Sequence, residues 1–199
     1  TSVSTRALKP RVAVLMAAVM NFVGALTFVG VAKAIANDIV DPMSLNAFED
    51  DITGSIVILA SLLSAITWNL LTWYYGIPSS SSHTLIGSIA GAAIGAAGFA
   101  ILNYEGFGKI LIALIVSPLL ALSVGFIVMS LFKVLFKNLS LYKTNSRFRL
   151  LQIGTAAIQA FTHGTNDAQK AMGIITFALV SGGFQDDLEV PLWVKLSAA

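Results

Sequence analysis

The stretch "FTHGTNDAQKAMG", residues 161–173, places a carboxylate, an amide and an ammonium inside a strongly apolar part of the chain. A carboxylate near the middle of a membrane costs roughly 3 kcal/mol on insertion scales, so Asp167 is a candidate functional residue. The preceding residues Thr165 and Asn166 add neutral oxygens to the anionic oxygens of Asp167. Because hard cations prefer oxygen ligands, the stretch predicts a site for Na⁺ or a proton at Asp167, Asn166 and Thr165.

The composition of the whole chain is that of an integral membrane protein in contact with lipid. Of its 199 residues, 56% are hydrophobic and 11% are charged, and the mean hydropathy is +0.83. An ordinary soluble domain carries roughly 25% charged residues. The absence of cysteine from the sequence excludes disulfides and thiolate metal sites. The small net charge of +2 gives no reason to expect nucleic acid as a partner.

Long stretches without formal charge predict four membrane-spanning helices, since one span needs about 20 apolar residues. The expected spans are residues 12–32, 52–75, 84–102 and 110–132. Residues 150–181 are also apolar, and we expect Gly164 to divide them into two half-helices or a helical hairpin. The predicted fold is an all-α polytopic membrane protein with broken helices.

The positions of Lys and Arg predict how the chain is oriented. Cytoplasmic loops carry an excess of these residues. Basic residues lie before the first expected span and after the fourth, so both regions are assigned to the cytoplasmic side. The loop between the first two spans is acidic instead, with Asp38, Asp41, Glu49, Asp50 and Asp51. We therefore expect a multi-pass protein of the cell (inner or plasma) membrane.

A second polar stretch, "PSSSSHT" at residues 78–84, is expected to begin a helix. Proline suits the start of a helix, and serine and threonine are good N-caps. The free amides at a helix N-terminus bind anions, so hydroxyls beside them would suit an oxyanion that has to bind and then leave. An interfacial loop with redundant caps accounts for the serines equally well.

The charged and titratable residues allow more than one role. His83 and His163 each lie in one of the two polar stretches, where each could bind a ligand, relay a proton or make an orienting hydrogen bond. Asp167 and Lys170 are three residues apart and could form a paired surface site at a helix end. An intramembrane hydrolase is a poor alternative because the sequence lacks a G-x-S-x-G motif, so we expect no enzyme activity.

Both polar stretches resemble the signatures of the PiT family of inorganic phosphate transporters, in its bacterial form. "GIPSSSSHTLIG" is similar to the serine-rich signature of the first repeat, and "THGTNDAQKAMGI" is similar to the G-x-N-D signature that opens the second. "STRALKP" followed by "AAVMNFVGAL" resembles the segment after the first G-x-N-D signature. The resemblance extends over essentially the whole chain.

The resemblance implies a symporter of two inverted repeats that carries phosphate with Na⁺ or H⁺, and it suggests a homodimer. Gln169 is a weaker candidate for the binding site, and Na⁺ is a possible metal ion at Asp167. Sulfate or another oxyanion remains an alternative substrate, and so does a metal–phosphate complex. The phosphate-binding residues carried over to this sequence are Ser81, Ser82, Thr84, Asn166 and Asp167.

The resemblance also predicts how the chain is divided. Residues 1–149 would form most of the first repeat and a basic cytoplasmic loop, and residues 150–199 would begin the second repeat. The first N-D signature would lie before Thr1, and the second Ser/Thr cluster would lie beyond Ala199. We therefore expect that these 199 residues alone do not transport.

Overall fold

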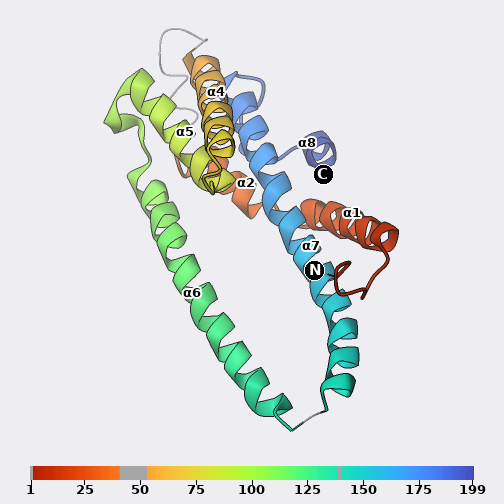
Figure 1. Cartoon of the computed structure of the whole chain (residues 1–199). Coiled ribbons are helices and arrows are strands. Elements are labelled where there is room, and N and C mark those ends of the chain that lie inside the picture. Colours follow the sequence, from red (N-terminus) through yellow and green to blue (C-terminus); the bar gives the residue numbers. More distant parts are fainter. Residues whose placement is uncertain (1, 41–52, 139) are drawn as a thin grey trace. The chain divides into compact units, whose positions relative to one another are not determined.

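The computed structural model describes residues 2–40, 53–138 and 140–199 (Figure 1). Four of the five acidic residues named in the loop between the first two expected spans, Asp41 and residues 49–51, lie outside this described part. The regular elements are helices, which confirms the predicted all-α class. Their bounds are α1 Pro10–Thr27, α2 Gly30–Asn37, α4 Thr53–Tyr74, α5 Ser81–Ala97, α6 Tyr104–Phe136, α7 Leu141–Ser181 and α8 Leu192–Ala198, with a short 3₁₀ helix, η1, at Phe99–Ile101.

Three described helices, α1, α4 and α6, are long and apolar enough to cross a membrane. They correspond to three of the four predicted spans, although α1 ends at Thr27 and α2 begins only at Gly30, so the span predicted at 12–32 is interrupted. The span predicted at 84–102 is also shorter than expected. There α5 has 17 residues, about 25 Å of helix, and it ends at Gly98. The C-cap residue is Gly98, and its positive φ of +75° is one that glycine adopts readily because it lacks a Cβ.

The predicted break at Gly164 is wrong, because α7 runs without interruption over 41 residues. A Cβ at Gly164 would overlap the backbone of Asn21 in α1, and a Cβ at Gly24 would overlap the carbonyl group of Phe161 in α7. Small residues let membrane helices approach closely. Gly164 therefore permits close packing of α1 on α7 and leaves the helix intact.

The chain divides into two compact units, and the first comprises Thr1–Thr27 and Leu111–Thr165. Besides the glycine contacts of α1 and α7, this unit contains an aromatic cluster. The rings of Phe132, Phe136 and Phe148 meet edge to face, with centroids 5.1–5.9 Å apart. These contacts join the end of α6 to the beginning of α7.

The second unit comprises Phe28–Ile110 and Asn166–Ala199. In it α4 and α5 pack side by side (Figure 1), and Phe177 from the last part of α7 is buried in the same apolar core. A Cβ at Gly54 would lie 2.9 Å from the Cβ of Ser181, which shows how closely α4 approaches α7. The other buried members of this core include Ile35, Ile39, Val57, Ile58, Leu85 and Ile89.

Candidate functional site

The serine-rich stretch forms the start of α5, as predicted. Ser80 is the N-cap, with extended backbone (φ −101°, ψ 119°), and its hydroxyl accepts a hydrogen bond from the amide of His83 at 3.4 Å. The Nδ1 atom of His83 lies 2.8 Å from the same hydroxyl. The Thr84 hydroxyl donates to the Ser80 carbonyl at 3.0 Å. A network of hydroxyls therefore fixes the first turn of α5, where free amides favour anions.

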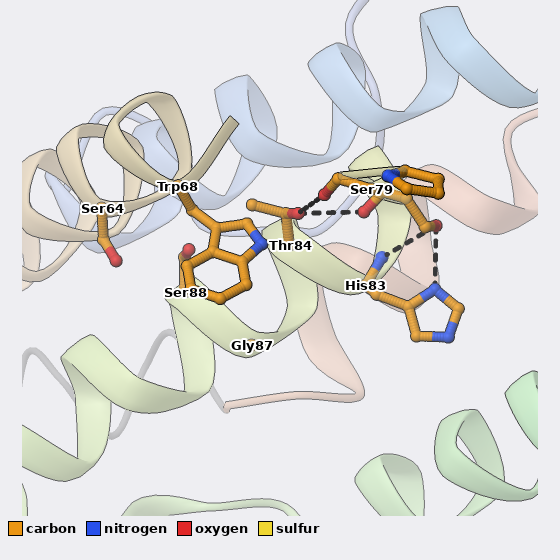
Figure 2. A pocket seen from close by; sticks show the side chains of 9 residues that line it. Ser64, Trp68, Ser79, His83, Thr84, Gly87 and Ser88 are labelled. Carbon is orange, nitrogen blue, oxygen red and sulfur yellow. Dashed lines mark hydrogen bonds between the residues drawn. The ribbon is translucent and has the colours of Figure 1, made fainter. Parts of the chain in front are cut away.

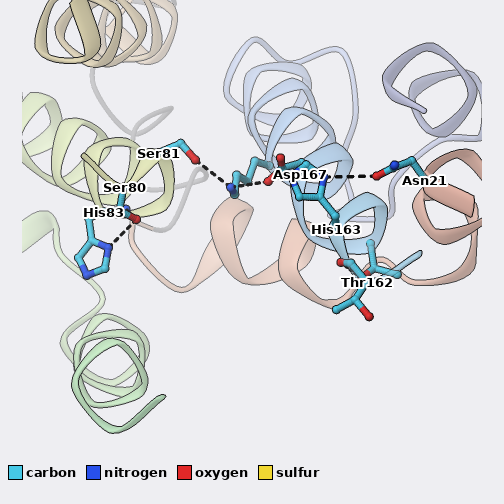
Figure 3. Close-up of polar contacts among 9 residues, drawn as sticks. Asn21, Ser80, Ser81, His83, Thr162, His163 and Asp167 are labelled. Carbon is cyan, nitrogen blue, oxygen red and sulfur yellow. Dashed lines mark hydrogen bonds and ion pairs between the residues drawn. The ribbon is translucent and has the colours of Figure 1, made fainter. Parts of the chain in front are cut away.

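The ammonium of Lys170 joins the two predicted signature stretches within the second unit. Its Nζ donates to Asp167 Oδ1 at 2.8 Å and to Ser81 Oγ at 3.0 Å, and Figure 3 labels Ser81 and Asp167 and draws the polar contacts as dashed lines. The Lys170 side chain is 19% exposed and that of Asp167 is 51% exposed. The structure thus brings together Ser81 and Asp167, which lie far apart in the sequence, through a residue that the predicted site did not include.

A paired surface site at a helix end is the alternative role that the sequence predicts for Asp167 and Lys170, and the two residues do form an ion pair. It differs from that alternative in position, because the pair lies well inside α7 and not at a helix end. Lys170 could have been identified as a site residue from the sequence, because it is a second charged residue in the same apolar segment as Asp167.

The remaining predicted residues lie at different places. Ser82 is half-buried in the first turn of α5, Thr84 is buried, and Asn166 is exposed on α7. Thr165 belongs to the first unit, and its hydroxyl donates to the Thr162 carbonyl at 2.6 Å. The Thr165 hydroxyl is therefore engaged with its own helix in this structure.

A cavity of about 510 Å³ with many hydroxyl groups lies between α4 and the start of α5 (Figure 2). Its volume is typical of a small-ligand pocket. Sequence reasoning missed Ser64 and Ser88, although Ser80, Thr84 and Ser88 recur every four residues and hence share one face of the helix. The residues that line the cavity are Ser64, Trp68, Pro78, Ser79, Ser80, His83, Thr84, Gly87 and Ser88.

Gln169 has a structural contact in the second unit. Its side chain is buried, and its Oε1 accepts hydrogen bonds from the amides of Val31 at 2.7 Å and Ala32 at 3.2 Å. These amides belong to the first turn of α2, whose N-cap residue Val29 provides no side-chain hydrogen bond. Gln169, which belongs to α7, thus caps the N-terminus of α2. This contact explains the role of the Gln169 side-chain oxygen without a bound ligand.

Both histidines make hydrogen bonds that orient neighbouring groups. His83 contacts the N-cap Ser80, and Nδ1 of His163 lies 3.3 Å from Oδ1 of Asn21 within the first unit (Figure 3). Among the described residues, no group of three or more His, Cys, Asp or Glu side chains could hold a metal ion.

Comparison with known proteins gives consistent matches along the chain. A model of the "Phosphate transporter family" matches residues 1–144 and 137–199. A Bacillus subtilis protein named probable low-affinity inorganic phosphate transporter is 62% identical over 200 residues, which are all of this chain and 58% of that protein. A Mycobacterium leprae protein of the same name is 42% identical over 202 residues, covering all of this chain and 47% of that protein. The chain thus spans about half the length of these relatives.

A solved structure shares the fold. The structure named "The sodium-dependent phosphate transporter" aligns with all of this chain and 66% of its own, with a TM-score of 0.83 and 20% sequence identity. At this identity the likeness establishes the helical architecture. The names of these proteins describe transporters, and the hydrolase alternative finds no counterpart among them.

Proposed function

The chain belongs to the phosphate transporter family, and we propose that it forms part of a secondary transporter that carries inorganic phosphate across the cell membrane with Na⁺ or H⁺. The observation that carries this proposal is the contact of Ser81 and Asp167 through Lys170 beside the capped start of α5. The serine hydroxyls and the Lys170 ammonium could bind an anion, and the Asp167 carboxylate could bind a cation. A symporter needs both capacities at one place.

Phosphate would be held at the N-terminus of α5. Ser81, Ser82 and Thr84 supply hydroxyls there, and free backbone amides of the first turn add favourable dipoles. From α7, Asn166 and Asp167 would add further contacts to the phosphate. Hydroxyls and amides bind a tetrahedral oxyanion without the strong retention of an arginine cluster, which suits a substrate that has to be released.

The coupling cation would bind at Asp167, with Asn166 and Thr165 as further oxygen ligands for Na⁺. A proton would instead neutralise the Asp167 carboxylate directly. In either case the added positive charge reduces the repulsion between this carboxylate and phosphate, so that each ligand favours binding of the other. The sodium dependence in the name of the similar structure supports Na⁺ as the first ion to test.

The larger organisation that we propose follows the family pattern. Residues 1–149 would form most of the first repeat with a basic cytoplasmic loop, and residues 150–199 would begin a second, inverted repeat. The full-length protein would supply the rest of the binding shell and would function as a homodimer. Transport would then proceed by movement of one repeat against the other around the central site.

Uptake of labelled phosphate into proteoliposomes tests the proposal. The full-length protein that contains this sequence is reconstituted, and a Na⁺ gradient or a pH gradient is imposed, one at a time. Uptake driven by either gradient is expected and identifies the coupling ion. Since sulfate has the same tetrahedral geometry, unlabelled sulfate is added as a competitor, and uptake of labelled sulfate is measured in a parallel assay. Phosphate that is not taken up under either gradient, together with sulfate that is, would contradict phosphate as the substrate.

A further inference from the structure

Lys170 differs in its surroundings from the other paired lysines of the described chain. Its side chain is 19% exposed, whereas Lys109, which pairs with Glu105 at 2.7 Å on the surface of α6, is 70% exposed. Lys33 lies 4.0 Å from Glu189, and its side chain is 50% exposed. Removing an ammonium from water is costly unless it is paired and hydrogen-bonded. A lysine that is less exposed than the other two and lies beside the proposed site therefore calls for a specific role.

The contacts of the Lys170 ammonium indicate what that role is. An ammonium has three N–H donors, and within the described part of the chain two of them go to Asp167 Oδ1 and Ser81 Oγ. Asp167 is the residue to which a coupling cation would bind, and Ser81 is one that would bind phosphate. Lys170 thus contacts one residue from each of the two proposed binding sites.

The two ligands would each disturb one of these contacts. A cation at Asp167 and the Lys170 ammonium would share one carboxylate, and two like charges so close together repel each other. A phosphate beside Ser81 would attract the same ammonium. Because lysine carries its charge on a flexible four-carbon stem, it can move between the two anions.

We propose that Lys170 is an exchangeable ion partner that pairs with Asp167 when the transporter is empty and with phosphate when the coupling cation occupies Asp167. This inference rests on the proposed function and adds a physical basis for coupling. The positive charge of Lys170 balances Asp167 in the empty site, and a monovalent cation together with a monovalent phosphate preserves that balance. Either ligand alone leaves an excess charge beside these residues, which disfavours single occupancy.

The test measures how each ligand changes the affinity for the other in the purified full-length transporter. Phosphate binding is titrated at several concentrations of the cation that drives wild-type uptake, and cation binding is titrated with and without phosphate. We expect the wild-type protein to bind phosphate about 10-fold more tightly at saturating cation, a coupling of ordinary size. Lys170→Met should bind phosphate more weakly, should bind the cation more tightly in the absence of phosphate, and should lose the mutual effect.

A matched control separates this role from a general effect of removing a lysine. Lys109→Met removes an ion pair of the same kind at an exposed position and should leave both affinities and their coupling unchanged. Lys170→Met with wild-type coupling would overturn the inference. Absence of phosphate uptake by the wild-type protein would instead contradict the proposed function, so the two failures are distinguishable.

A second variant covers the case in which Lys170→Met does not fold. Lys170→Arg keeps the positive charge, but the guanidinium can bind a carboxylate through two parallel hydrogen bonds and holds it more firmly than an ammonium does. We therefore expect the affinity for the cation in the absence of phosphate to fall in this variant. An unchanged cation affinity would also contradict the inference.

Discussion

Gly164 of α7 lies so close to Asn21 of α1 that a methyl group at position 164 would overlap the Asn21 backbone. A second glycine, Gly24, meets the Phe161 carbonyl group in the same way from the α1 side. Glycine inside a helix costs about 1 kcal/mol relative to alanine. The close approach of two backbones in the first unit is a physical reason for a glycine at each position.

We predict that Gly164→Ala destabilises the full-length protein by about 1–3 kcal/mol, the usual effect of inserting a methyl group into a packed interior. Thermal unfolding of the purified protein in detergent measures this effect. Gly154→Ala is the matched control, because a Cβ at position 154 of the same helix meets no atom within 4 Å in the described part of the structure. A Gly164→Ala variant as stable as the Gly154→Ala variant would contradict the packing role.

We predict that Gln169→Leu uncaps α2. The substitution leaves the amides of Val31 and Ala32 without the acceptor that they have now, and each buried unsatisfied donor costs about 1–3 kcal/mol. Hydrogen exchange at the start of α2 should become faster, and the melting temperature should fall.

Gln152→Leu provides the comparison for this effect. Gln152 accepts a hydrogen bond from Thr5 at 2.8 Å, but this bond is exposed and water can replace it. The Gln152 variant should therefore change stability little. Protection of α2 that is the same in wild-type protein and in Gln169→Leu would refute the capping role.

We predict that Ser80→Ala loosens the first turn of α5. Its hydroxyl accepts from the His83 amide and lies 2.8 Å from the His83 ring, and loss of an N-cap costs about 1 kcal/mol. Because phosphate would bind at this helix start, the KM for phosphate uptake should rise in Ser80→Ala. Ser80→Thr keeps a capping hydroxyl and should retain most of the wild-type KM. The prediction fails if both variants take up phosphate with the same KM.

The sequence predicted those features that depend on neighbouring residues. The cap at Ser80 follows from local chemistry, and the apolar lengths of α4 and α6 follow from composition. Gly164 was misjudged because a glycine suits either a break or a close contact, and the partner at Asn21 lies 143 positions earlier in the sequence. Local patterns do not reveal such a partner.

In the candidate site, too, the sequence predicted the individual residues but not the contacts between residues that lie far apart in the chain. The polar character of Ser81 and Asp167 was evident from the sequence, but their connection depends on the contact of Lys170 with Ser81, which lies 89 positions before it. The spacing of Asp167 and Lys170 indicated only that the two could pair. The cap that Gln169 provides for α2 likewise depends on tertiary packing, because Val31 lies 138 positions away.

The most direct test of the proposed site is gradient-driven uptake of labelled phosphate by Asp167→Asn in the full-length protein. This substitution keeps the size of the side chain but removes the charge that would attract the coupling cation. Asp186→Asn, at an exposed position of the loop before α8, is the control. We predict that Asp186→Asn transports at the wild-type rate, whereas Asp167→Asn inserts into the membrane but takes up no more phosphate than protein-free liposomes. Wild-type uptake by Asp167→Asn under the same gradient would contradict the assignment of Asp167 as the coupling residue.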